Sequence, residues 1–152
     1  LVTRIPMLVW APGIFEGGRS IDGLCQHMEI GPAILEMAGV EVPPTFEAQS
    51  LLPVLQGKEW TARDYVYAEQ IKDGILTETE FMSMIRNEEW KLVHFLHMKC
   101  GQLFNLKDDP NEVRNLWDEA AARGIKQRLL DQLREWHIES QVHTHDWASE
   151  WR

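Results

Sequence analysis

The sequence has few of the features that mark disulfide-rich, membrane-spanning or nucleic-acid-binding proteins. Its two cysteines, Cys25 and Cys100, are too few for a disulfide framework or a cysteine-rich zinc site. No apolar run approaches the roughly 20 residues of a membrane-spanning helix. The 15 Lys and Arg are outnumbered by 24 Asp and Glu, and the net charge of -9 opposes binding to phosphate backbones. We expect no membrane span, no nucleic-acid partner and two buried free thiols, with a single bridge between them as the alternative.

Common catalytic and metal-binding motifs are missing as well. There is no GxSxG nucleophile elbow, no HExxH zinc pair and no phosphate-binding glycine loop. His143, His145 and Asp146 in "HTHD" could ligate a metal if a strand aligned them, but a surface tail lacks the outer residues that orient ligands. His94 and His97 are an odd number of residues apart, which places them on opposite faces of a strand. We therefore predict no metal site in this chain.

The residues that are present indicate a globular protein with a true core. Of 152 residues, 44% are hydrophobic and 26% charged, and a chain of this length can bury about two thirds of its unfolded surface. Four of the seven tryptophans lie in the last quarter, which predicts that this end packs against something: Trp117, Trp136, Trp147 and Trp151. Because the sequence opens at Leu1 and not at Met, we expect it to continue a longer protein, and its cellular location is left unknown.

The first 59 residues indicate one strand and two helices. The apolar run from Ile5 to Trp10 predicts a strand buried on both faces, as in the interior of an α/β sheet. A helix follows, with Pro32 near its first turn and Gly39 at its end. A second, short helix is predicted between Ser50 and Gly57. The apolar residues of the first helix share one face: Ile30, Ile34, Leu35 and Ala38.

The character of the sequence changes near residue 60. "DYVYAEQ", "FMSMIRN", "WKLVHFLHM" and "QLFNL" are short segments rich in β-branched and aromatic residues, which predicts four antiparallel strands, the last three as a meander. Asp108 and Asp109 precede Pro110, so we interpret them as turn residues and not as catalytic carboxylates. Apolar residues at helical spacing predict a C-terminal helix that ends at His137: Ala121, Ile125, Leu129, Leu133 and Trp136.

In this order, the segments resemble the C-terminal third of the sulfatase family within the alkaline phosphatase superfamily. "TRIPMLVWAPG" is similar to the family's Arg-Val-Pro strand, and "QHMEIGPAILEMAGV" to its Ser-His-Val-Asp helix. "AQSLLPVLQG" resembles its Ser-Leu-Leu-Pro segment, and "MIRNEEWKLV" its Arg-x-x-x-aromatic-Lys strand pair. "GQLFNLKDDPNEVRNL" is similar to a segment that begins Glu-Leu-Tyr-Asp-Leu and ends Asn-Leu. Five positions depart from the family pattern: Glu29 for Asp, Ala33 for Thr, Ala48 for Gly, Asn105 for Asp and Asn111 for Gly.

The resemblance implies an enzyme that uses formylglycine, made from Cys or Ser, beside a divalent metal that is usually calcium. Neither Cys25 nor Cys100 stands in the required Cys-x-Pro-x-Arg. We therefore expect the nucleophile and the metal ligands to lie before Leu1, with no catalytic residue in this chain. Of the matching positions, His27 and Arg86 are expected near the substrate, although His27 also fits a helix-start histidine satisfied by local backbone.

We therefore predict an α/β protein with three parts. Residues 1–59 would end a large α/β sulfatase domain, residues 60–137 would form a small four-stranded antiparallel sheet packed by a helix, and residues 138–152 would be a tail. The predicted function is that of the C-terminal part of a sulfate ester hydrolase, inactive alone. Its partners would be the missing N-terminal catalytic half and, through exposed edges and the Trp-rich tail, other copies of itself. The alternatives are part of a phosphodiesterase or phosphonate monoester hydrolase, or a non-catalytic binding or assembly module.

Overall fold

The computed structural model describes residues 4–72 and 79–144, without the side chains of residues 143 and 144. The chain divides into two compact units. We call Asp64–Glu139 the sheet unit and the described residues up to Arg63 the N-terminal unit, and each is described by itself. Across the described residues, no helix is both long enough and apolar enough to cross a bilayer.

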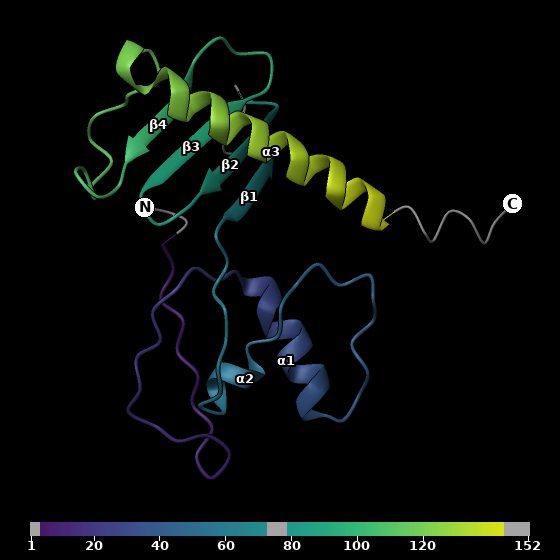
Figure 1. Ribbon diagram of the computed structural model, residues 1–152. Helices are drawn as coiled ribbons and strands as arrows, with labels where there is room; N and C mark the ends of the chain where they lie inside the picture. The colour runs from purple at the N-terminus through teal and green to yellow at the C-terminus, as the bar shows by residue number, and fades with distance from the viewer. Residues whose placement is uncertain (1–3, 73–78, 145–152) are drawn as a thin grey trace, which may run out of the picture. The chain divides into compact units, whose positions relative to one another are not determined.

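The sheet unit is built on four antiparallel strands in sequence order, as predicted (Figure 1). They are β1 (Val66–Ile71), β2 (Phe81–Arg86), β3 (Trp90–Phe95) and β4 (Gly101–Asn105). Ile85 pairs with Leu92, and Leu92 pairs with Leu103. Because paired residues in a sheet point to the same side, these three side chains form a continuous apolar row.

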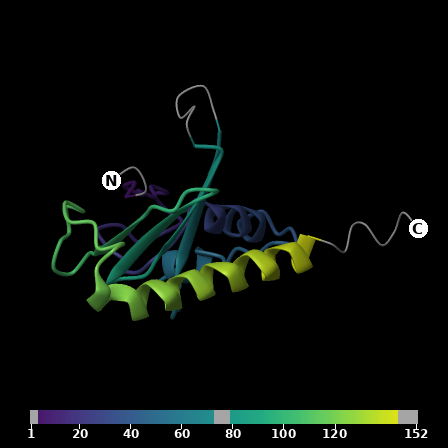
Figure 2. The ribbon, with the colours of Figure 1, turned by 90° about the horizontal axis from the view of Figure 1, so that it is seen from above.

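Helix α3 (Arg123–Thr144) follows the short helix η2 (Ala120–Ala122) and covers one face of the sheet (Figure 2). Its Leu129 and Leu133 pack with the apolar row of Ile85, Leu92 and Leu103. The three row residues are completely buried. The predicted sheet and covering helix are therefore confirmed, and they enclose a core within the sheet unit.

The helix continues beyond His137, where we expected it to end. Ile138 and Val142 are exposed by 51% and 67%, so no apolar face continues into this last part. The residues from 138 to 144 nevertheless contain no Gly or Pro to stop the helix. The predicted end was wrong because it followed the apolar pattern alone. Trp147 and Trp151 lie outside the described residues.

The N-terminal unit holds three short helices: η1 (His27–Glu29), α1 (Ile30–Met37) and α2 (Leu52–Leu55). Gly39 ends α1 with a positive φ of 70°. Its amide donates to the Glu36 carbonyl at 3.1 Å, and the Val40 amide donates to the Leu35 carbonyl at 2.9 Å. This is a Schellman motif, in which glycine adopts the left-handed conformation at low cost. The predicted glycine stop is therefore confirmed.

The expectation of a buried strand at residues 5–10 of the N-terminal unit was wrong. Residues 5–10 form no strand, and Leu8 and Trp10 are exposed by 91% and 82%. A strand needs a hydrogen-bonded neighbour, and the sheet of the described residues does not include this segment. In α1, Ile30 and Ile34 are exposed, whereas Pro32 and Ala33 are buried.

Both cysteines are free, which excludes the alternative of a bridge between them. Cys25 is half-buried, as expected in part, but Cys100 is exposed in the connection between β3 and β4. The expectation of two buried thiols was therefore wrong for Cys100. Cysteines are buried in most proteins, but this general tendency does not determine the exposure of a single residue in a turn such as Cys100.

Candidate functional site

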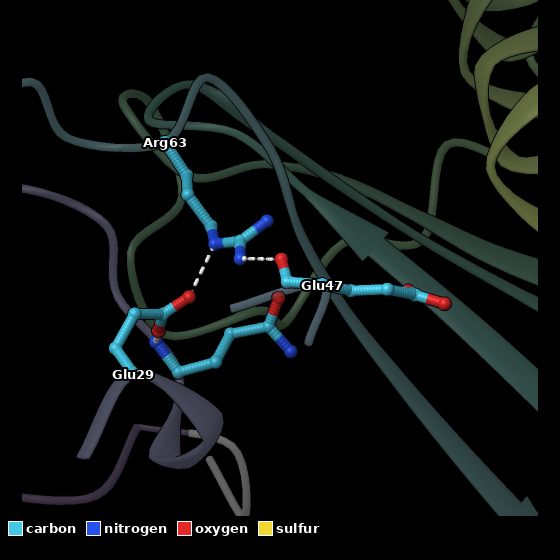
Figure 3. A network of polar contacts seen from close by, with 4 residues as sticks. Glu29, Glu47 and Arg63 are labelled. Carbon is cyan, nitrogen blue, oxygen red and sulfur yellow. Dashed lines mark hydrogen bonds and ion pairs between the residues drawn. The ribbon is translucent and has the colours of Figure 1, made fainter. Parts of the chain in front are cut away.

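The most buried polar group of the N-terminal unit is the carboxylate of Glu29 (Figure 3). It accepts hydrogen bonds from the Gln26 amide and from Nε of Arg63. Arg63 also donates from Nη2 to the Glu47 carbonyl at 2.8 Å. The guanidinium therefore joins η1 to the segment before α2, and the charge-assisted bonds compensate for the burial of Glu29. This position carries Asp in the family pattern, and the longer Glu here completes a capping box with Gln26.

Cys25 lies close to this buried carboxylate. Burial raises the pKa of its thiol, and the negative charge of Glu29 raises that pKa further. Because the thiolate is the reactive form, both effects make Cys25 a poor nucleophile near neutral pH. The local electrostatics agree with the absence of the formylglycine motif around this residue.

His27 is the first residue of η1 and is exposed. Its imidazole has no hydrogen-bond partner among the described residues, so the local backbone does not satisfy it. Proximity of His27 to a substrate stays a prediction.

Arg86 ends β2, and its side chain points away from α3 because Ile85, one residue before, points toward the core. Its Nε is buried and has no hydrogen-bond partner among the described residues. Lys91 is its partner on β3 and donates from Nζ to Oε2 of Glu112 at 2.6 Å. Arg86 and Lys91 are thus neighbouring cations, and among the described residues only the carboxylate of Glu112 forms an ion pair with either of them. A buried N–H without a hydrogen-bond partner costs about 1–3 kcal/mol of stability.

His27 belongs to the N-terminal unit and Arg86 to the sheet unit, so the position of one does not support the assignment of the other. The guanidinium of Arg86 is partly exposed and has no partner among the described residues, which is an independent reason to consider it, because an anion could pair with its accessible part. Sequence analysis found Arg86 only through the resemblance.

The segment "KDDPNEVRNL" connects β4 to η2 and wraps the outer edge of β4. Asp109 accepts a hydrogen bond from the Arg114 amide at 2.8 Å, which confirms its predicted role in a turn. Asn115 donates from Nδ2 to the Gly101 carbonyl at 2.9 Å and accepts from the Leu103 amide at 2.9 Å. The Leu116 amide adds a bond of 2.8 Å to the Leu103 carbonyl. These residues satisfy the free edge of the sheet, a role that sequence analysis missed.

Glu112 adopts a positive φ of 57° in the same segment. A left-handed conformation costs a residue other than glycine about 1–2 kcal/mol. The ion pair with Lys91, whose side chain is 8% exposed, holds it in place. The family pattern has a glycine at position 111, whereas the left-handed residue of this chain is Glu112, one position later.

A hydroxyl, an imidazole and a carboxylate meet on the helix-covered face of the sheet. Nε2 of His137 lies 3.1 Å from Oγ of Ser83, and Nδ1 lies 3.3 Å from Oε1 of Glu69. The order matches that of a hydrolase triad. Ser83 is only 4% exposed beneath α3, however, so a substrate cannot reach its hydroxyl. The cluster serves to attach α3 to β1 and β2, beside the stacked rings of Tyr67 and Trp136 at 4.3 Å.

No group of three or more His, Cys, Asp or Glu side chains gathers around a common point in the described part of the chain. These residues therefore do not fit a resident metal ion, which needs several close oxygen or nitrogen donors. The remaining candidates, His145 and Asp146, lie outside the described residues, as does the side chain of His143.

The family model described as N-sulphoglucosamine sulphohydrolase, C-terminal, matches residues 2–139 of the chain. The chain belongs to this sulfatase family. Its sulfatase relatives are members of the alkaline phosphatase superfamily, which confirms the resemblance seen in the sequence. The sheet, the covering helix and the edge segment of residues 107–116 are thus features of a sulfatase C-terminal region.

Three similar proteins define how much of a sulfatase this chain represents. An N-acetylglucosamine-6-O-sulfatase of Bacteroides thetaiotaomicron is 26% identical over 136 residues, which are 87% of this chain and 24% of that protein. A protein solved in complex with its substrate D-glucosamine-2-N,6-O-disulfate is 25% identical, with a TM-score of 0.63 over 75% of this chain and 24% of that one. A phosphonate monoester hydrolase from Silicibacter pomeroyi shares the fold, with a TM-score of 0.77 at 23% identity over 90% and 29% of the two chains. This chain therefore spans about a quarter of the length of each of these proteins.

Proposed function

We propose that this chain is the C-terminal part of a metal-dependent sulfatase that hydrolyses sulfate esters. The observation that carries the proposal is the match to a sulfatase C-terminal family over residues 2–139. The sheet unit would act as a structural subdomain beside the substrate cleft. The whole enzyme would supply the nucleophile from a residue outside this chain.

The catalytic chemistry would come from a formylglycine and a calcium ion held elsewhere in the enzyme. Cys25 does not suit the role of nucleophile, because burial and Glu29 raise the pKa of its thiol. The described residues also offer no cluster of metal ligands. A bound divalent cation would neutralise the sulfate group and lower the pKa of the attacking oxygen.

Two residues of this chain would act on the substrate side. Arg86, whose side chain is partly exposed at the end of β2, would bind a sulfate oxygen through the accessible part of its guanidinium, because charge-assisted hydrogen bonds to an anion are the strongest available to it. His27, which is exposed and has no described partner, would contact the substrate directly or through water. Both roles concern binding and orientation.

The partner of this chain would be the catalytic half of the same enzyme. The N-terminal unit exposes a set of apolar side chains that an isolated domain would bury: Ile5, Leu8, Val9, Trp10, Ile14 and Ile34. Exposed apolar area of this kind marks a surface that another protein surface covers. Association between copies of the isolated chain through the same residues would follow from the same cause.

The proposal is tested by activity measurements on the chain and on the whole enzyme. The 152-residue chain should show no turnover of an aryl sulfate with calcium, and turnover above the blank would contradict the proposal. In the whole enzyme, Arg86→Gln should raise KM about tenfold or more, as expected for a lost charged hydrogen bond. Arg134→Gln, an exposed arginine already paired with Asp131, is the matched control for this measurement.

A phosphonate monoester hydrolase is the second candidate, because the fold match to the Silicibacter pomeroyi enzyme covers 90% of the chain. At 23% identity this likeness concerns the fold alone. The ratio of kcat/KM for an aryl sulfate and for an aryl phosphonate, measured on the whole enzyme, decides between the two.

A further inference from the structure

A hollow of about 650 Å³ lies on the sheet unit, between the edge segment and the start of α3. Its apolar lining includes Leu116, Ala122 and Ile125. Trp90, the first residue of β3, also lines it. A volume of 300–1,000 Å³ with mostly apolar walls is the usual size of a small-molecule site. The size and lining therefore suit a ligand of one or two sugar rings.

The charged side chains around the hollow are two arginines and one glutamate, Arg114, Arg128 and Glu119. Nη2 of Arg114 donates to Oε1 of Glu119 at 3.1 Å. Arg128 is exposed and has neither an ion pair nor a hydrogen bond among the described residues. The hollow thus carries a local charge of +1 on a chain whose net charge is -9. An anion is the ligand that this charge favours.

Gly124 borders the hollow and is the second residue of α3. A glycine inside a helix costs up to about 1 kcal/mol relative to alanine. Here no neighbour requires it, because a Cβ at this position would meet no atom within 4 Å. The glycine therefore gives nothing to the packing of the helix, and its visible effect is to leave the hollow open.

We propose that the hollow lined by Trp90, Arg114 and Arg128 binds a sulfated saccharide. A guanidinium fork can donate two parallel hydrogen bonds to neighbouring oxygens of a sulfate group. The apolar face of an indole can pack against the C–H face of a sugar ring. Arg128 supplies the free cation, and Trp90 supplies the aromatic surface.

The choice of sugar rests on the proposed sulfatase function, but binding by this chain is measured separately from turnover. If the saccharide does not bind to this chain, the turnover measurement still tests the proposed sulfatase function, and if turnover fails, the binding measurement still tests the hollow.

The test is an NMR titration of the isotope-labelled 152-residue chain with D-glucosamine-2-N,6-O-disulfate. Shifts should concentrate on the Trp90 indole and on the amides of residues 122–128. Glucosamine without sulfate should bind at least tenfold more weakly, since it lacks the anion. Inorganic sulfate at equal ionic strength should bind several-fold more weakly than the disulfate, since it lacks the ring. Equal affinities for the disulfate and inorganic sulfate would show a simple anion site and overturn the saccharide assignment.

Three variants make the test specific. Arg128→Gln should weaken binding about tenfold, whereas Arg134→Gln on the same helix, which removes the same charge from a pair with Asp131, should leave it unchanged. Glu119→Gln should strengthen binding, because it frees Arg114. Gly124→Leu should abolish binding by filling the hollow, and it replaces glycine with a better helix former. Absence of binding, or equal losses in the two arginine variants, would overturn the proposal.

Discussion

Different interactions stabilise each of the two units of this chain internally. In the sheet unit, strands that follow one another in sequence meet a single helix, and their apolar side chains are fully buried. In the N-terminal unit, large apolar side chains are exposed, and a buried ion pair with its hydrogen bonds connects the helices. The sheet unit therefore has a core of its own, whereas the N-terminal unit depends on polar contacts and has an apolar surface left to cover.

Among the substitutions that test this difference between the units, the largest effect is expected at Arg63. Arg63→Met would leave the Glu29 carboxylate fully buried without its cation, which costs about 3–5 kcal/mol. The loss should be seen as faster hydrogen exchange of the Leu51 amide, which donates to the Glu29 carbonyl. Arg134→Met, which breaks an exposed pair, should change stability by less than about 1 kcal/mol. Equal effects would mean that the buried pair does not hold this unit.

The next largest difference is expected between two leucines. Leu92→Ala in the sheet unit should lower the free energy of unfolding by about 2–5 kcal/mol, because it leaves a cavity in a closed core. Leu8→Ala in the N-terminal unit should change it by no more than about 0.5 kcal/mol, since Leu8 is exposed. Urea unfolding followed by tryptophan fluorescence measures both. A costly Leu8→Ala would show that the isolated chain buries this segment.

A smaller effect is expected at Gly101, which lies directly against the ring of Trp117. A Cβ at this position would lie 2.4 Å from the Trp117 ring, so Gly101→Ala should cost about 1–3 kcal/mol. Gly124→Ala has open space around it and should instead stabilise α3 by up to about 1 kcal/mol. Thermal unfolding of the two variants should shift in opposite directions. A shift in the same direction would contradict the packing at one of these two sites.

The smallest effect concerns His94 on the helix-covered face. Burial lowers the pKa of His94, and the nearby His137 lowers it further. The side chains that face it are Ser83 on β2 together with Trp117 and His137 from beyond the sheet. The unfolded chain binds a proton at His94 more readily than the folded chain does. The free energy of unfolding therefore has its full contribution from His94 above pH 6.5, and this contribution falls as the pH drops below that value. His94→Gln should flatten the dependence of the urea midpoint on pH between 5 and 7, and an unchanged slope would contradict this.

The two units also differ in how well the sequence predicts them. The strands could be found because their apolar residues and turns are local signals, and the C-terminal helix because its apolar spacing is regular. The pair of Glu29 and Arg63 joins residues 34 positions apart, and no local pattern marks such a contact. Residues 5–10 were predicted as a strand from composition, which says nothing about whether a neighbouring strand is present. The end of α3 was misplaced because helix propensity alone extends it past His137.

The candidate residues were predictable only in part. Arg86 was found from the resemblance, but its buried and unpaired Nε is a property of three-dimensional structure. Asn115 matches the family motif, yet its function at the edge of β4 depends on the backbone of Gly101 and Leu103. The hollow beside Trp90 and Arg128 joins residues from β3, the edge segment and α3, which no sequence window contains together.

The asparagine beside β4 limits how copies of this sheet can join. Its amide group and the backbone of Leu116 already occupy the edge groups of Gly101 and Leu103, so a foreign strand cannot add there without displacing them. The β4 edge of the sheet is therefore closed to strand addition, and replacement of Asn115 would open it again.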